Sequence, residues 1–204
     1  MIVKRIPAGV YAANCYILID ELTKECAVID PGGDAEDLIS YIEELGTKVK
    51  YILLTHGHID HIGAVGQLKE HFKVEAHISK ADGELIKAHE YMFGPLKHKD
   101  EEVVFNMDIC ENKVFTLGEL GVRCIETPGH TPGGVSFLVD DKLFTGDTLF
   151  LRSIGRTDLS GGDFNTLIEN IKNKLFTLND NITVFPGHGP QTSISYERQN
   201  NPFL

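Results

Sequence analysis

Short apolar runs separated by polar turns dominate the first thirty residues and predict strands around Val3, Tyr16 and Val28. After a turn, residues 34–45 are predicted to form a helix, whose first residue is an aspartate suited to the N-cap and whose end is expected at Gly46. The remainder of the first half is predicted to alternate between the two element types: a strand at 50–54, a helix at 61–72, a strand at 74–78 and a helix at 79–88.

The second half is predicted to consist mainly of strands. They are expected near residues 113–117, 121–126, 135–139, 142–145 and 182–185, with one helix from about 164 to 177. Between the halves, Glu90 to Asn112 is the least regular stretch, and we expect a loop that is either a lid or a pocket wall, or an acidic solvated loop. No linker, low-complexity tract or short repeat divides the chain, which indicates one domain.

Side chains able to bind metal are concentrated in residues 55–61, which read Thr-His-Gly-His-Ile-Asp-His directly after an apolar strand. Alternation along an extended chain places His56, His58 and Asp60 on one side, and His61 lies in the first turn of the following helix. Neutral imidazoles and carboxylates are ligands that zinc, iron and manganese accept. Three imidazoles and one carboxylate within seven residues therefore predict a metal site.

Three further candidate ligands stand in turns where predicted strands end. His130 lies in a turn rich in Gly and Pro, Asp147 follows the strand at 142–145, and His188 follows the strand at 182–185. With the first cluster they make five histidines and two aspartates. This set is too large for one tetrahedral ion, but it is sufficient for two ions that share a carboxylate.

The motif H-x-H-x-D-H, formed by His56, His58, Asp60 and His61, resembles the hallmark of the metallo-β-lactamase-fold hydrolase superfamily. The resemblance covers nearly the whole chain. It implies one α/β domain over residues 1–204, built as a four-layer αββα sandwich, and two divalent metal ions, Zn²⁺ first with Fe or Mn as alternatives. The ligand sets that it implies are His56, His58 and His130 for one ion, Asp60, His61 and His188 for the other, and Asp147 as the bridge.

The remaining histidines have no ligand-like spacing, and we expect surface or packing roles for them. They are His71, His77, His89 and His98.

Two later segments resemble a narrower branch of that superfamily. Residues 153–163, which contain Gly-Arg-Thr-Asp at 155–158, and residues 196–203 are similar to the short glyoxalase II-like enzymes. That resemblance implies hydrolysis of a thioester such as S-D-lactoylglutathione, a small-molecule glutathione conjugate. The longer enzymes of this branch add a helical carboxy-terminal domain and have a tyrosine-containing turn after the last histidine, whereas here Gly189-Pro190 follows.

Arg156 stands where the glyoxalase II enzymes carry a substrate-binding lysine. Two interpretations are open for it. Its guanidinium either holds a carboxylate of the substrate, or it is a structural anchor that pairs with Asp158 or Asp163.

The chemistry that two metals imply is attack by hydroxide on a carbonyl carbon. A water that bridges two divalent ions loses its proton near neutral pH, and one ion also polarises the carbonyl oxygen. Asp60 is the candidate catalytic residue, which orients the hydroxide and helps to move its proton. Because a thiolate leaves without prior protonation and an amide nitrogen does not, a thioester is favoured over a β-lactam.

Two other functions are weighed against hydrolysis. Persulfide dioxygenases share the fold and the Gly-Arg-Thr-Asp stretch, and by resemblance they would place one iron on His56, His130 and Asp147. A non-catalytic or flavodiiron-related redox role is the third, but that branch replaces ligand residues and attaches a flavin domain.

Composition narrows the partners. A net charge of −11 without clustered Lys and Arg argues against nucleic acid. The amino terminus is too short in apolar length for a signal peptide and no stretch approaches a membrane span, so we expect a cytoplasmic protein without membrane contact. The cysteines lack C-x-x-C spacing, and Cys15, Cys26 and Cys124 lie in apolar runs, which predicts buried reduced thiols.

Overall fold

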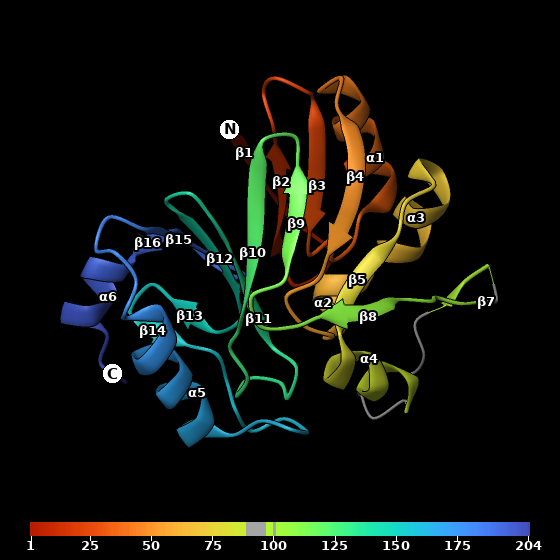
Figure 1. Ribbon diagram of the computed structural model, residues 1–204. Coiled ribbons are helices and arrows are strands. Elements are labelled where there is room, and N and C mark those ends of the chain that lie inside the picture. The colour runs from red at the N-terminus through yellow and green to blue at the C-terminus, as the bar shows by residue number, and fades with distance from the viewer. Residues whose placement is uncertain (89–96, 100) are drawn as a thin grey trace.

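Two six-stranded β-sheets packed face to face form the centre of the computed structural model, which describes residues 1–88, 97–99 and 101–204 (Figure 1). The first sheet has, in spatial order, β1 (Ile2–Ala8), β2 (Ala13–Ile19), β3 (Glu25–Ile29), β4 (Lys48–Leu53), β5 (Ala76–Ser79) and β8 (Asn106–Ile109). The second has β16 (Thr192–Ser193), β15 (Thr183–Pro186), β12 (Lys142–Gly146), β11 (Val135–Val139), β10 (Leu120–Glu126) and β9 (Val114–Leu117).

Helices cover the outer face of each sheet. The first sheet packs against α1 (Ala35–Glu44), α3 (Val65–Phe72) and α4 (Lys80–Lys87), and the second packs against α5 (Phe164–Asn170), a π-helix (Ile171–Leu175) and α6 (Ile194–Asn200). The short elements are α2 (Ile59–Ile62), β6 (Lys97–His98), β7 (Glu101–Glu102), β13 (Leu149–Phe150) and β14 (Ser153–Ile154). The chain is therefore one α/β domain with four layers, as predicted.

Alternate side chains of β2 pack into two different hydrophobic cores, one on each face of the first sheet. Every residue of β2 is buried. Ile17 and Ile19 pack in the core beneath α1 and α3, whereas Tyr16 and Leu18 pack in the core between the sheets. Successive side chains of a strand point to opposite faces, so a strand covered on both faces is apolar throughout.

The prediction of one continuous helix at 61–72 is wrong. The structure has α2 and α3 instead, separated at Gly63 and Ala64. The amide of Ala64 donates to the carbonyl oxygen of Pro31 at 2.9 Å, so it is not available to continue α2. A Cβ at Gly63 would lie 2.4 Å from the carbonyl oxygen of Gly32, which shows how closely the turn after β3 approaches this break.

Asp34 occupies the N-cap position of α1, as predicted, but its side chain does not cap the helix. Asp34 has φ +50° and makes no side-chain bond to α1; its carboxylate accepts from the amide of Gly9 at 2.7 Å. The predicted end of the helix is confirmed, since Gly46 follows α1 with φ +63°, a conformation that glycine adopts without strain.

Two expectations for longer segments need correction. The helix predicted at 164–177 begins as α5 but continues as a π-helix, in which the amide of Phe176 donates to Ile171 five residues earlier. Part of the loop predicted at 90–112 lies outside the described residues, namely 90–96 and 100. Within the described part, β8 adds a parallel edge strand beside β5, so that part is not irregular throughout.

Strand ends of both sheets lead to the candidate ligands. The parallel strands β3 and β4 end just before Asp30 and residues 55–61, and the parallel pair β12 and β15 ends just before Asp147 and His188. The carboxyl ends of parallel strands lie at one edge of a sheet, so the fold gathers these side chains. Among the described residues, no helix combines the length and apolar character needed to cross a membrane.

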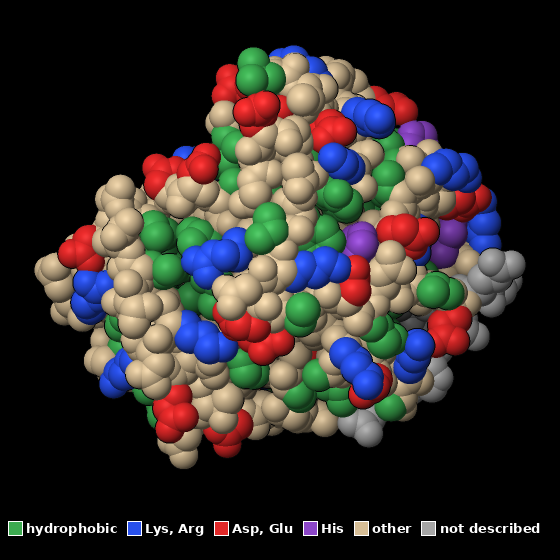
Figure 2. Space-filling model, viewed as in Figure 1, with side chains coloured by type: hydrophobic (Ala, Val, Ile, Leu, Met, Phe, Trp, Pro, Cys, Tyr) green, Lys and Arg blue, Asp and Glu red, His purple; other side chains and the backbone are tan. Residues whose placement is uncertain are grey.

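Charged side chains of both signs are interspersed over the face shown in Figure 2, where Lys and Arg stand next to Asp and Glu. Salt bridges such as Lys50–Glu25 and Lys174–Glu111 also pair opposite charges in the structure. The net charge of −11 is therefore not gathered into one acidic field on this face.

Candidate metal centre

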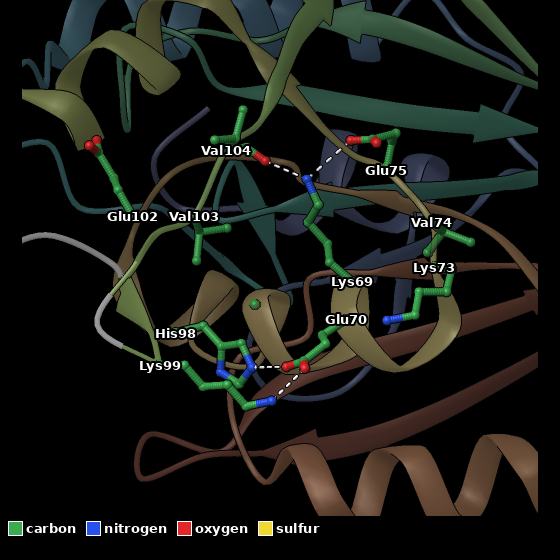
Figure 3. A pocket seen from close by; sticks show the side chains of 11 residues that line it. Lys69, Glu70, Lys73, Val74, Glu75, His98, Lys99, Glu102, Val103 and Val104 are labelled. Atoms are coloured by element: carbon green, nitrogen blue, oxygen red, sulfur yellow. Dashed lines mark hydrogen bonds and ion pairs between the residues drawn. The ribbon is translucent and has the colours of Figure 1, made fainter.

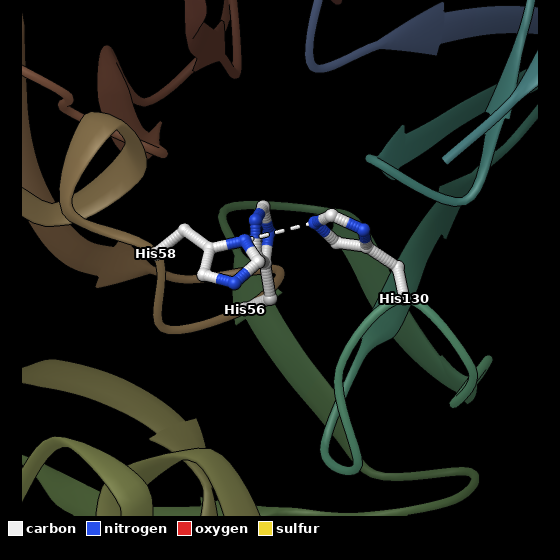
Figure 4. A group of neighbouring side chains, drawn as sticks. All are labelled: His56, His58 and His130. Carbon is white, nitrogen blue, oxygen red and sulfur yellow. Dashed lines mark hydrogen bonds between the residues drawn. The ribbon is translucent and has the colours of Figure 1, made fainter. Parts of the chain in front are cut away.

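Three histidines from the two sheets meet at one point (Figure 4). His56 and His58 follow β4 of the first sheet, and His130 lies in the turn between β10 and β11 of the second. One ring nitrogen of each lies within 4.8 Å of the others, and His130 Nε2 is 2.9 Å from His58 Nδ1. Ligands about 2.0–2.1 Å from a tetrahedral zinc ion are about 3.4 Å apart, so this spacing suits one ion.

A second group lies beside the first. Asp60 and His61 are on α2, and His188 follows β15. Their ligand atoms also lie within 4.8 Å of one another, and His188 Nε2 is 3.2 Å from Asp60 Oδ2.

Asp147 lies between the two groups. Its Oδ1 is 3.4 Å from His61 Nε2, while its Oδ2 is 3.6 Å from both His130 Nε2 and His188 Nε2. One carboxylate thus contacts the groups on both sides, which is the arrangement that a bridging ligand needs. The structure brings together all seven residues that the sequence singled out as candidate ligands.

Outer hydrogen bonds fix the orientation of three imidazoles. His61 Nδ1 lies 3.0 Å from Asp30 Oδ2, and His56 Nδ1 lies 3.0 Å from the hydroxyl of Thr55. That hydroxyl donates to the same Asp30 oxygen at 2.6 Å. His130 Nδ1 bonds the carbonyl oxygen of Arg156 at 2.7 Å. With Nδ1 engaged, each ring turns Nε2 toward the centre.

Sequence reasoning missed Asp30. It also groups with His56 and His61 at ligand distance, but its two oxygens already accept from the Thr55 amide, the Thr55 hydroxyl and His61. Asp30 therefore acts as an orienting group. A signal was present, because Asp30 follows an apolar strand in the same way as the candidate ligands do.

Unsatisfied buried atoms indicate that this donor set suits cations. Among the described residues, His56 Nε2, His61 Nε2 and Asp147 Oδ1 are buried and have no hydrogen-bond partner. A buried polar atom without a partner is costly, and the atoms concerned are ligand atoms of both groups. A metal ion coordinated by these atoms would remove that cost.

The pKa values of His56 and His58 agree with metal binding by this group. Burial, together with the nearby imidazoles of His61 and His130, holds the pKa of His56 well below its usual value, and burial with His130 lowers the pKa of His58 to about 3. Neutral imidazole is the form that binds metal. Burial alone would lower the pKa of His61 as well, but the carboxylates of Asp147 and Asp30 raise it to about 9. The negative charge of Asp147 and Asp30 beside His61 therefore favours binding of a cation at this position.

An open pocket of about 540 Å³ exposes the two groups to solvent. Its wall beyond the candidate ligands is mostly apolar or aromatic and is made by Tyr11, Phe150, Ile154, Leu159 and Arg156. The guanidinium of Arg156 binds the carboxylate of Asp158 through two hydrogen bonds of 2.7 Å, so Asp158 is its partner. Asp163 instead caps α5 by accepting from Thr166.

The other histidines that the structure describes pair with carboxylates away from this centre: His71 with Glu43, His77 with Asp108 and His98 with Glu70. His89 lies outside the described residues. The three paired histidines thus agree with the expected surface or packing roles. Cys15, Cys26 and Cys124 are buried free thiols, also as expected.

A larger hollow of about 620 Å³ lies beside α3, remote from the histidine groups (Figure 3). Several of the charges that line it are paired, since Lys69 bonds Glu75, and Glu70 bonds both His98 and Lys99. Opposite charges that neutralise each other in this way do not form a site for an anion or a cation.

Comparisons with known proteins agree with the fold. The model of the metallo-beta-lactamase superfamily matches residues 8–188. Hydroxyacylglutathione hydrolase GloC of Haemophilus influenzae is 42% identical over 210 residues, which cover 100% of this chain and 98% of that protein. The solved structure of BLEG-1 B3 metallo-beta-lactamase has a TM-score of 0.89 at 36% identity and covers 100% of this chain and 99% of its own. TTHA1623 in a di-iron-bound form has a TM-score of 0.84 at 32% identity, covering 98% and 100%.

The first prediction concerns Asp30. Replacing Asp30 by Asn removes an acceptor from a buried network that satisfies Thr55 and His61, and we expect it to lower the free energy of unfolding by about 2–3 kcal/mol. Urea denaturation of the metal-free protein measures this. The Asp34→Asn variant is the control, because that carboxylate accepts one exposed bond, and its loss should be clearly smaller. Equal midpoints for Asp30→Asn and the wild type would contradict the role given to Asp30.

Proposed function

The chain belongs to the metallo-β-lactamase superfamily of metallo-hydrolases, and we propose that it is a dinuclear enzyme that hydrolyses thioesters such as S-D-lactoylglutathione. The observation that carries the proposal is the pair of ligand groups that meet at Asp147 below an open pocket. The 42% identity with a hydroxyacylglutathione hydrolase supports the thioester class.

In this proposal the seven residues divide into two ligand sets. His56, His58 and His130 would hold one ion, Asp60, His61 and His188 would hold the other, and Asp147 would contribute to both. Two divalent cations bound there would supply a hydroxide nucleophile near neutral pH and would polarise the carbonyl oxygen of the substrate. We propose zinc, with iron or manganese accepted; the di-iron-bound form of TTHA1623 supports the capacity of related sites for iron.

Asp60 is the proposed catalytic residue. Burial would raise its pKa, but the hydrogen bond from His188 and the proximity of His61 lower it to about 2, so the carboxylate is ionised at neutral pH. An ionised carboxylate at the pocket wall accepts a hydrogen bond from the attacking water, orients it and helps to transfer its proton.

The pocket wall favours a thiolate leaving group. A thiolate leaves without a proton because its conjugate acid has a pKa of about 8.5, whereas an amide nitrogen must be protonated. Apart from the proposed ligands, the described lining offers two polar side chains, Tyr11, which is 59% exposed, and Arg156, which is permanently charged. Thioester hydrolysis therefore suits this wall better than amide hydrolysis, because it needs no general acid to protonate the leaving group.

Metal analysis beside a substrate panel tests the proposal. We expect about two metal ions per chain and turnover of S-D-lactoylglutathione, with slower or no turnover of a β-lactam. One iron per chain with oxygen uptake on glutathione persulfide would instead show a dioxygenase. A metal-loaded protein that turns over none of these substrates would show a non-catalytic or redox role.

Replacement of Asp147 by Ala should remove metal and activity together, because its oxygens contact both groups. We expect kcat/KM to fall by at least about a thousandfold, with loss of at least one bound ion, measured on the same preparation. Asp141→Ala, which removes an exposed carboxylate paired with Lys142, is the control and should retain both. Normal metal content with normal activity in Asp147→Ala would refute the assignment.

Arg156 and Asp158 form a matched pair of tests for the proposed substrate contact. If the guanidinium binds a carboxylate of the substrate, Arg156→Ala raises KM with little change in kcat, and Asp158→Ala lowers KM because it releases the competing partner. Neither change should move the melting temperature much, since exposed ion pairs contribute little stability. An anchor without a substrate contact would leave KM unchanged in both variants.

A further inference from the structure

We propose that Asp82 is a positioning residue that holds together the loops carrying His58 and His130, and that it thereby sets the metal affinity of the group formed by His56, His58 and His130. The inference rests on the proposed dinuclear site. Asp82 touches neither substrate nor metal in this proposal; it acts through the two loops.

The carboxylate of Asp82 bonds both loops at once. Its Oδ2 accepts from the amide of Gly57 at 2.8 Å, and its Oδ1 accepts from the amide of Gly133 at 2.7 Å. The residue is fully buried, with 0% of its surface exposed. Charge-assisted bonds to a buried carboxylate are strong and are costly to leave unpaired, so they hold the two amides at a fixed separation.

These amides lie in loops that follow strands of different sheets. Gly57 lies between His56 and His58 after β4 of the first sheet, and Gly133 lies three residues after His130 in the second. The 2.9 Å approach of His58 to His130 therefore depends on how far apart the two loops are kept. Asp82, in the first turn of α4, bonds to both of them.

Both loops pack closely on the start of α4. A Cβ at Gly133 would lie 2.0 Å from Ser79 Oγ and 2.6 Å from Asp82 Oδ1, and a Cβ at Gly57 would lie 3.1 Å from Ile86 Cδ1. Ser79 in turn accepts from the amide of Asp82 at 3.3 Å, which fixes the first turn of the helix. The glycines therefore permit an approach at which one carboxylate reaches both amides.

The second ligand group has different supports. Its His61 is held by Asp30, and the turn that carries His188 is held by the side chain of Asn14, which donates to the carbonyl oxygens of Pro186 and Gly189 at 2.9 Å. A backbone bond from Val135 to Thr55 at 2.8 Å also joins the sheets, at the strand ends. Loss of the Asp82 bonds should therefore weaken the first group selectively.

A double-mutant cycle on zinc affinity tests this selectivity. His188→Ala removes a ligand of the second group, His58→Ala removes one of the first, and Asp82→Asn is made in each background. Zinc binding to the metal-free proteins is measured by competition with a chromophoric chelator. We expect Asp82→Asn to weaken binding about tenfold or more in the His188→Ala background and less than about threefold in the His58→Ala background.

Two further variants separate positioning from general stability. Ser79→Ala weakens the start of the same helix but leaves both carboxylate bonds in place, so it should lower the melting temperature without changing either zinc affinity. Gly133→Ala keeps the carboxylate but pushes the His130 loop away from it, and it should reproduce the selective loss if Asp82→Asn does not fold.

The outcomes separate this inference from the proposed function. Equal losses in the two backgrounds, or no loss in either, would overturn the role of Asp82 while a wild-type protein that binds two zinc ions upholds the dinuclear site. A wild-type protein that binds fewer than two ions refutes the dinuclear site, and this inference with it.

Discussion

The constraint on which the structure depends is the crowding of five imidazoles and two carboxylates at the junction of two sheets. Several of their ligand atoms are buried without hydrogen-bond partners. Such an arrangement costs free energy unless cations compensate it. The sandwich supplies the rigidity that keeps it together, because the candidate ligands lie on the short helix α2 or in turns just after strands that are anchored in the apolar cores.

Hydrogen bonds from neighbouring residues orient the candidate ligands on this rigid scaffold. Asp30 organises Thr55 and His61, the carbonyl of Arg156 engages His130, and Asp82 spans the loops from the two sheets. These contacts link residues 25 to 51 positions apart along the chain. The residue types that could bind metal are therefore recognisable from short stretches of sequence, but the orientation of their side chains depends on contacts made in the tertiary fold.

This division explains what could be predicted from the sequence. Strand positions follow from apolar runs, and the ligands stand out because imidazoles and carboxylates cluster at strand ends. The break between α2 and α3 and the left-handed Asp34 could not be read in this way, since both result from the approach of the turn after β3 and of Gly9. Asp82 was missed as a site residue for the same reason, because a single aspartate within a helix carries no local sign of the amides that it will bind, whereas Asp30 was marked by its place directly after an apolar strand.

In the proposed enzyme, the side chains that would contact the substrate lie in a different part of the molecule from the ligand groups. The pocket wall comes from the loop before β2 and from the segment between β12 and α5, where Phe150, Ile154 and Leu159 are apolar and Arg156 is bound by Asp158. Relatives with 42% and 36% identity bear the names of a hydroxyacylglutathione hydrolase and of a metallo-beta-lactamase, so overall similarity does not distinguish the two substrate classes. Changes in a few wall side chains can alter substrate specificity while the ligand groups stay the same. The wall residues lie on loops, whereas the candidate ligands lie close to the ends of core strands.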